Sequence, residues 1–198
     1  MTSINIDSLT IAGFITPASG SIKFGDRDVT SIPTHKRNIG MVFQDYALFP
    51  DKSVNTNVAY GLKARKVPKS EIPARIQEAL ERVGMADRAH HRPSEMSGGQ
   101  QQRVAIARAI ATHPPIIMAD EPTGALDSRT GREVLAMLQD IHRQGNTVVL
   151  ITHDNSIAVQ AQRIIRLEDG HVVYDGDATA PEAVVTPRAA GRFGGVPS

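Results

Sequence analysis

Two short apolar segments predict strands that are buried on both faces of a sheet. Residues 116–119 (IIMA) are followed at once by Asp120 and Glu121, and residues 147–152 (TVVLIT) are followed by His153. Apolar runs of this length without polar alternation are typical of parallel strands. Because parallel strands bring their carboxyl ends to one edge, where open sheets bind ligands, we expect the two carboxylates and the histidine to lie at one site.

Apolar residues at helical spacing mark three helices. The first follows a Ser-Gly-Gly-Gln turn at 97–100 and stops at the HPP sequence of 113–115. The second has apolar positions 72, 76, 80 and 83, with Ser70 as its predicted N-cap and Gly84 at its end. The third is capped by Asp127 or Ser128 and ends at Gly145. It lies between the two apolar strands, which predicts a right-handed strand-helix-strand crossover.

Alternating and turn-rich segments predict an antiparallel portion. Residues 21–24 meet a Gly25-Asp26 turn, and residues 163–167 and 171–175 form a hairpin. A further strand at 38–43 (NIGMVF) ends at Gln44. The fold class is therefore α/β: a parallel sheet core with an antiparallel β portion and a helical lobe.

The turn at 97–100 has the chemistry of an anion site. Its two glycines leave the first N–H groups of a helix accessible, and the positive end of the helix dipole favours a phosphate there. Beyond the turn, Asp120 is a hard oxygen ligand suited to Mg²⁺. The neighbouring Glu121 is placed to deprotonate a water as general base.

Composition limits the remaining classes. The 198 residues are 40% hydrophobic and 22% charged, with a formal net charge of +1, as in an ordinary globular protein without broad attraction to nucleic acid or membrane. The chain has no cysteine, which removes disulfides and cysteine-metal sites and is compatible with a reducing compartment. No apolar run approaches the roughly 20 residues that span a bilayer, and no signal peptide is expected, so membrane association would need a partner.

Four motifs, taken together, resemble those of ATP-binding cassette (ABC) transporter ATPases. They are the SGGQQQR sequence at 97–103, DEP at 120–122, ALD at 125–127 and THD at 152–154, which resemble the signature, Walker B, D-loop and switch-histidine motifs in that order. Each motif alone is weak, whereas their joint order and spacing are highly specific. The resemblance covers most of the chain and implies a P-loop NTPase-like core.

The resemblance also implies roles for individual residues, with ATP and Mg²⁺ as cofactors. The implied catalytic residues are Glu121, His153 and Gln44; the implied nucleotide-binding residues are Ser97, Gly98, Gly99, Gln100 and Asp127; and the implied metal ligands are Asp120 and Gln44. In this family the glutamine contacts Mg²⁺ and the attacking water, and the histidine contacts the γ-phosphate.

The implied partners are a transmembrane permease subunit and a second nucleotide-binding subunit in a head-to-tail dimer, without nucleic acid. The implied location is cytoplasmic, peripheral on the inner face of the cell membrane. The apolar residues of the DYALFP segment, 45–50, are either local core or a surface that docks on the permease. By contrast, His90 and His91 lack carboxylate or cysteine neighbours in the sequence and are expected in a solvated loop.

One family motif is absent from the sequence. Nowhere in the chain is a glycine followed by lysine, so the GxxxxGK[ST] loop that holds the β and γ phosphates has no counterpart, and residues 1–10 (MTSINIDSLT) supply neither glycine nor lysine. We therefore expect the first strand and the P-loop to be missing, as in a chain truncated or rejoined there. The expected parts are a partial ATP-binding core at 1–52, a helical subdomain at 53–112, the rest of the core at 113–176, and a disordered tail at 177–198.

The two halves of the sequence resemble different branches of this family. Up to about residue 92 the chain resembles polyamine and ferric-iron importer ATPases, and from residue 93 it resembles lipoprotein-release and macrolide-export ATPases, so the cargo stays open. Three alternatives to an ATP-binding transport subunit stay open as well. They are an inactive regulatory subunit that lends its signature turn to a partner, a DNA-associated repair ATPase, which the DYALFP segment and near-neutral charge disfavour, and a truncated or composite chain that folds poorly.

Overall fold

The computed structural model describes residues 8–168 and 170–184. These residues fall into two compact units, 8–151 and 152–184 with residue 169 left out. None of the helices in the described part is long and apolar enough to cross a membrane.

A three-stranded parallel sheet forms the centre of the first unit. Its strands are β3 (Ile39–Val42), β4 (Ile116–Asp120) and β5 (Thr147–Ile151), in the order β3-β4-β5. Strand β4 lies in the middle, with Ile117 beside Gly40 on one side and beside Val148 on the other. A separate antiparallel pair, β1 (Lys23–Phe24) and β2 (Arg27–Asp28), turns at Gly25 and Asp26. The α/β prediction, with a parallel core and antiparallel strands, is confirmed.

The sheet buries its strands unequally. The central residues of β4 are buried, as predicted. Strand β5 was also predicted to be buried, and this is wrong: four of its residues are half-buried and Thr147 is exposed. The reason is its position, because β5 pairs with β4 alone among the described residues and so lacks a neighbour on its other side.

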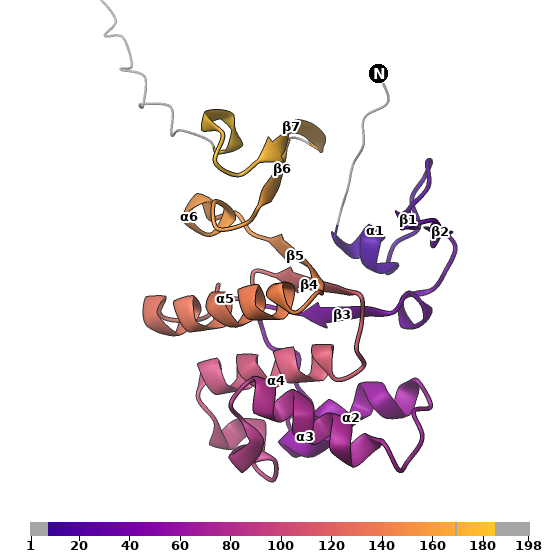
Figure 1. The fold of residues 1–198 in the computed structure, drawn as a ribbon, viewed down its shortest axis with the longest axis vertical. Helices are drawn as coiled ribbons and strands as arrows, with labels where there is room; N and C mark the ends of the chain where they lie inside the picture. Colours follow the sequence, from indigo (N-terminus) through magenta and orange to yellow (C-terminus); the bar gives the residue numbers. More distant parts are fainter. Residues whose placement is uncertain (1–7, 169, 185–198) are drawn as a thin grey trace, which may run out of the picture. The chain divides into compact units, whose positions relative to one another are not determined.

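Helices cover one face of the sheet in two layers. The helix α4 (Gly98–Ile110) lies between the sheet and the helices α2 (Val54–Ala64) and α3 (Ile72–Arg82), as Figure 1 shows. A further helix, α5 (Ser128–Arg143), connects β4 to β5. Apolar residues of β3, β4 and these four helices form one continuous core, which is why α4 is buried over most of its circumference.

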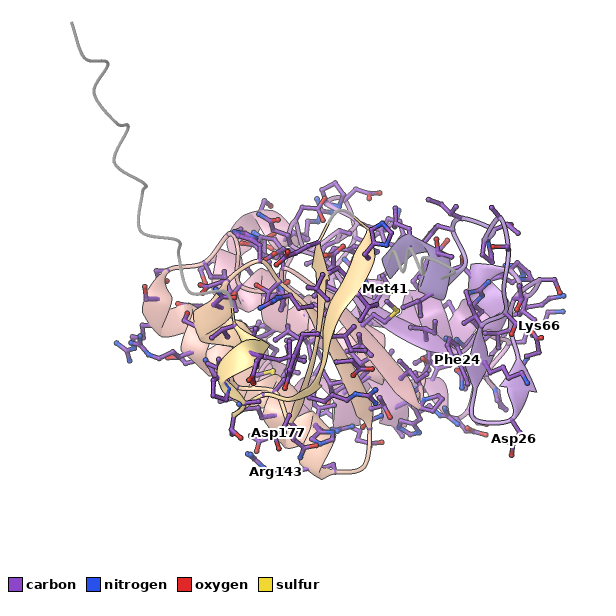
Figure 2. The ribbon with its side chains drawn as sticks, turned by 90° about the horizontal axis from the view of Figure 1, so that it is seen from above. Phe24, Asp26, Met41, Lys66, Arg143 and Asp177 are labelled. Carbon is purple, nitrogen blue, oxygen red and sulfur yellow. The ribbon has the colours of Figure 1, made fainter. Side chains whose placement is uncertain are left out.

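The opposite face carries a smaller apolar cluster. Ala12 of the short helix α1 (Ser8–Ala12) is fully buried there with Ile39 and Met118. Phe24 and Met41, both labelled in Figure 2, are partly buried against this cluster.

The buried guanidinium of Arg37 fastens α1 to the chain that follows it. It donates hydrogen bonds to the carbonyls of Thr10 (2.8 Å) and Ile11 (2.6 Å) at the end of α1, and to those of Thr30 (3.0 Å) and Ile32 (2.7 Å). Burial lowers the pKa of Arg37. Four carbonyl acceptors satisfy a buried cation without a carboxylate.

The helix boundaries agree with the periodicity, with one change. Gly84 and Gly145 have φ of +66° and +102° and follow α3 and α5 closely, as glycines at helix ends do. The N-cap position of α3 is occupied by Glu71, not by the predicted Ser70, and it makes no side-chain cap. Three 3₁₀ turns, η1 (Thr34–Lys36), η2 (Ala86–Arg88) and η3 (Pro93–Glu95), complete this unit.

The second unit is a hairpin with two short helical turns. Helix α6 (Asn155–Ala158) precedes the antiparallel strands β6 (Arg163–Glu168) and β7 (His171–Asp177), which confirms the predicted hairpin. The turn η4 (Pro181–Ala183) follows, and its Ala183 is buried with Ile164 and Ala178. The start of the predicted disordered tail is therefore packed up to residue 184, because small alanines fit against the hairpin, and 185–198 lie outside the described residues.

Candidate functional site

A cleft of about 400 Å³ opens at the carboxyl end of the sheet. It is lined by Phe43, Gln44, Asp45, Asp120, Glu121 and Ala125. The parallel pairing places Val42 beside Ala119, so the residues that follow β3 and β4 emerge at the same edge. Three of the predicted site residues, Gln44, Asp120 and Glu121, therefore come together although about 76 residues separate them in the sequence.

Glu121 sits in an unusual backbone conformation at this edge. Its φ is +44°, a left-handed value that residues other than glycine adopt rarely. Its N–H donates to the carbonyl of Ile151 at the end of β5 (3.0 Å), and its own carbonyl accepts from the N–H of Gly124 (3.0 Å). Both bonds hold the turn that directs the chain away from the strand. Strained residues of this kind concentrate at functional sites.

The turn at 97–100 is a complete capping box. The hydroxyl of Ser97 accepts from the N–H of Gln100 (3.3 Å), and the side chain of Gln100 accepts from the N–H of Ser97 (3.0 Å). The N–H groups of Gly98 and Gly99 belong to the first turn of α4, where a helix offers no internal acceptor. The turn therefore has the donors that the anion-site prediction requires.

Glycine is needed in this turn because other elements pack against it. A β-carbon at Gly98 would lie 2.6 Å from the hydroxyl oxygen of Tyr46, and one at Gly99 would overlap the methyl group of Thr130. A β-carbon at Gly124 would likewise lie 3.0 Å from the side-chain amide of Gln44. The signature turn, the Gln44 loop and the start of α5 are thus in contact within one unit.

Asp127 caps α5, which decides between the two predicted caps. Its carboxylate accepts from the N–H groups of Arg129 and Thr130 (both 3.0 Å) and from the Thr130 hydroxyl (2.7 Å). The Thr130 hydroxyl, followed by the Thr130 and Arg129 backbone amides, lowers the pKa of Asp127. An exposed, ionised carboxylate therefore stands at this helix start, and its predicted part in nucleotide binding stays a prediction.

His153 belongs to the second unit, where it is exposed and lies two residues before the start of α6. The next residue, Asp154, is the N-cap of α6 and accepts from the N–H (2.8 Å) and hydroxyl (2.7 Å) of Ser156. The hydroxyl of Ser156 and its N–H lower the pKa of Asp154. The role of His153 beside a phosphate stays a prediction.

The oxygen atoms at the cleft suit Mg²⁺, which needs few protein ligands, better than they suit a metal that is coordinated by protein side chains alone. No cluster of three or more His, Cys, Asp or Glu side chains occurs in the described ranges. Asp120 and Gln44 offer one carboxylate and one amide oxygen at the cleft, and Mg²⁺ commonly takes one or two protein oxygens together with water and substrate phosphates. A bound Mg²⁺ would supply charge neutralisation at the phosphates.

Three polar residues that hold backbone loops were not predicted as site residues. Gln102 and Asn57 are buried, and Arg108 is half-buried. Gln102 and Arg108 donate to backbone carbonyls of the loops at the cleft, and Asn57 donates to carbonyls of residues 49–53. Their signal in the sequence is a polar residue within an apolar helical stripe. The acceptors that explain them lie up to 62 residues away, however, so the sequence could not identify the partners.

The sequence is similar to those of known proteins. A family model described as ABC transporter matches residues 8–124. The spermidine/putrescine import ATP-binding protein PotA of Thermobifida fusca (strain YX) is 44% identical over 187 residues, covering 93% of this chain and 49% of that protein. The macrolide export ATP-binding/permease protein MacB 2 of Aeromonas hydrophila is 43% identical over 180 residues, covering 88% of this chain and 28% of that protein. The chain is thus similar to importers and to exporters, which agrees with the mixed resemblance of its two halves.

Solved structures agree with these matches. The ATP-binding cassette MJ0796, in a dimeric post-hydrolysis state bound to ADP and Pi, has a TM-score of 0.75 and 36% sequence identity, covering 87% of this chain and 79% of that chain. The present chain spans about half the length of the import relatives that it matches. With this sheet and this set of motifs, and with a family model that matches more than half of its residues, the chain belongs to the ABC transporter family.

Proposed function

We propose that this chain is the ATP-binding subunit of an ABC membrane transporter, in which ATP binding and hydrolysis are coupled to transport. The single observation that carries the proposal is the cleft in which Gln44, Asp120 and Glu121 meet. This set provides a metal ligand, a general base and a polar group for the attacking water, which are the parts that phosphoryl transfer to water requires.

At this cleft, Asp120 and Gln44 would hold Mg²⁺, and Glu121 would orient the water and accept its proton. His153 hydrogen-bonds the γ-phosphate. The backbone of Glu121 is held by hydrogen bonds to Ile151 and Gly124, which supports a fixed place for this residue at the cleft.

A second nucleotide is bound by the signature turn in a head-to-tail dimer with another nucleotide-binding subunit. Ser97, Gly98, Gly99 and Gln100 present amides and a hydroxyl to the partner's γ-phosphate, and Asp127 lies at the same junction. The capping box supports this role because it fixes the turn before any ligand arrives. The dimeric structure of the similar cassette MJ0796 supports the expectation of a dimer.

The chain's own nucleotide site is defective in this proposal. No Gly-Lys pair occurs in the 198 residues, so the loop of amides and the lysine that grip the β and γ phosphates are missing from this sequence. Removing one preorganised donor typically costs about 10²- to 10³-fold in rate, and a whole cradle is lost here. The 198-residue chain alone should therefore bind ATP weakly and hydrolyse it negligibly.

The permease partner docks on the DYALFP segment, which places the subunit on the inner face of the cell membrane. The rings of Phe49 and Tyr60 pack at an angle of 52° with centroids 4.7 Å apart, and the two residues are 37% and 58% exposed. An exposed aromatic pair on a rigid support suits a protein partner. The formal net charge of +1 gives no reason to expect a nucleic-acid partner.

Titration of the 198-residue chain with Mg-ATP, alone and with an intact ATP-binding cassette added, tests the proposal. We expect weak binding and negligible hydrolysis by the chain alone, and tighter binding and faster hydrolysis by the mixture than by the same amount of cassette alone. Mg²⁺-dependent turnover by the chain alone, abolished in Glu121→Gln, would show that the cis site is not defective. A mixture that binds and hydrolyses ATP no better than the cassette alone would contradict the nucleotide-binding role itself.

The completeness of the signature turn favours one further candidate, a regulatory subunit that never hydrolyses ATP but lends this turn to a partner. Ser97→Arg should then damage the mixed complex, whereas Glu121→Gln in this chain should leave its turnover unchanged. The third possibility, a chain that folds poorly, predicts no cooperative melting by circular dichroism. These three outcomes are distinct.

A further inference from the structure

Gln102 is a fully buried polar side chain in the middle of α4. Its Nε2 group donates one hydrogen bond to the carbonyl of Pro122 (2.7 Å) and one to the carbonyl of Phe43 (3.3 Å). Phe43 directly precedes Gln44, and Pro122 directly follows Glu121. One amide nitrogen therefore joins the backbones of the two loops that line the cleft.

The other end of this side chain is left without a hydrogen bond. The Oε1 atom of Gln102 is buried and has no partner. The reversed amide would be worse, because it would place the oxygen against two carbonyls. A buried, unsatisfied acceptor is unfavourable, and most such groups in native proteins have a reason to be kept. Packing alone does not require glutamine here, since an unbranched apolar side chain would fill a similar volume.

We propose that Gln102 is a positioning residue that sets the separation between Gln44 and Glu121 across the cleft. It does so because both of its donors are used on carbonyls adjacent to those two residues. The inference rests on the proposed function, which gives Gln44 and Glu121 their roles, and it deepens that function by naming the residue that holds them in register.

A second contact shows that α4 holds the Gln44 loop on both sides. Arg108, six residues further along the helix, donates to the carbonyls of Ala47 (2.6 Å) and Tyr46 (3.1 Å). Phe43 and Ala47 flank Gln44 in the chain, so α4 fixes the loop before and after it. Gln102 differs from Arg108 because it alone also reaches the Glu121 side. The test therefore depends on two loops responding together.

Hydrogen exchange followed by mass spectrometry provides that test without nucleotide. The reporters are the Tyr46 N–H, bonded to the Phe43 carbonyl (3.2 Å), and the Gly124 N–H, bonded to the Glu121 carbonyl (3.0 Å). In Gln102→Met, which keeps an unbranched side chain but removes both donors, exchange should accelerate about tenfold in the segments 43–50 and 121–127 together.

Ile106→Val is the matched control, because Ile106 is fully buried in the same helix and makes no polar contact with either loop. This variant should destabilise α4 without selective acceleration in the two segments. Acceleration in only one segment, in neither, or equally in the control would overturn the positioning role and leave Gln102 as a packing residue.

The unsubstituted chain gives a test that does not depend on a folded variant. By NMR, both Nε2 hydrogens of Gln102 should exchange at least about tenfold more slowly than those of the half-buried Gln101, whose amide has one backbone acceptor at 3.2 Å. Equally rapid exchange would overturn the proposal. Both measurements are made without ATP, so failure of the nucleotide titration would contradict the proposed function and leave this result standing.

Discussion

The hydroxyl oxygen of Tyr46 lies 2.6 Å from the point where a β-carbon at Gly98 would stand. The contact connects the loop after Gln44 to the first residue of α4. We expect Gly98→Ala to lower the free energy of unfolding by about 1 kcal/mol, because the added methyl group overlaps this oxygen. Chemical denaturation measures the change.

The partner substitution decides whether this contact is the cause. Tyr46→Phe removes the hydroxyl and leaves the ring carbon about a normal contact distance from the new methyl group, at 3.5 Å. The double variant should therefore regain most of the stability that Gly98→Ala loses. If the two effects simply add, the contact does not limit residue 98.

Ala47 lies in a left-handed conformation, with φ of +47°, and Arg108 holds its carbonyl. In Ala47→Gly the backbone strain of about 1 kcal/mol is relieved, and this offsets the greater flexibility of glycine in the unfolded chain. Stability should therefore stay the same or rise slightly. Ala136→Gly, at an exposed position inside α5, should instead lose about 1 kcal/mol. Thermal denaturation measures both variants, and an equal loss of stability in the two would contradict backbone strain at Ala47.

Asn57 holds the backbone of residues 49–53 from inside the protein. Its buried Nδ2 group donates to the carbonyls of Phe49 (3.2 Å), Lys52 (3.2 Å) and Ser53 (3.1 Å), and its Oδ1 accepts from the Phe49 N–H (2.8 Å). Asn57→Asp replaces the donors with a buried negative charge facing three carbonyls, and should cost about 3 kcal/mol at pH 7.

The loss should shrink near pH 4, where protonation removes the charge. Asn55→Asp is the matched control, since Asn55 is exposed in the first turn of the same helix, where a negative charge is favourable. Urea denaturation at both pH values compares the two variants. Similar losses would mean that burial of Asn57 is not the cause.

The lowered pKa of Asp127 predicts that the stability of the folded chain depends on pH. Its pKa is lowered in the folded chain, chiefly by the Thr130 hydroxyl, so the folded state holds the proton less tightly than the unfolded state does. The stabilising contribution is therefore complete above the ordinary aspartate pKa of about 4 and is lost as the pH falls through the lowered folded value.

Asp127→Asn keeps a good N-cap but removes the titrating group. As the pH falls from about 5 to about 2, the variant should therefore lose less stability than the parent. Thermal melting across this range measures the difference. A parallel decline in both proteins would assign the acid sensitivity to other carboxylates, such as Asp175, whose pKa is lowered by the Arg163 guanidinium.

Local pattern was sufficient for α3, α4 and α5 and for the place of Asp120 and Glu121 at the carboxyl edge of the sheet. Helix α5 begins after Asp127 and its chain turns at Gly145, and both follow from side-chain capping and a left-handed glycine. The place of Asp120 and Glu121 follows from one rule, that neighbouring parallel strands end at the same edge, whereas Gln44 was assigned to the site by the family resemblance.

The remaining features depend on contacts between distant parts of the chain. The half-burial of β5 follows from which strands are its neighbours, which its own five residues do not encode. Likewise, Gln102 lies 59 residues from Phe43 in the sequence, so its place in an apolar helical stripe does not identify the carbonyl that it binds. The left-handed turn at Glu121 is a further case, since nothing in a DEP sequence requires it.

The contacts of α4 set a strict rule for insertions and deletions. Each residue added to a helix turns everything beyond it by about 100° and advances it by about 1.5 Å. One extra residue between Ser97 and Arg108 would therefore swing the guanidinium away from the loop that it holds, while the turn at the start of the helix stayed in place. The number of residues between Ser97 and Arg108 is therefore fixed by the contacts at both ends of α4.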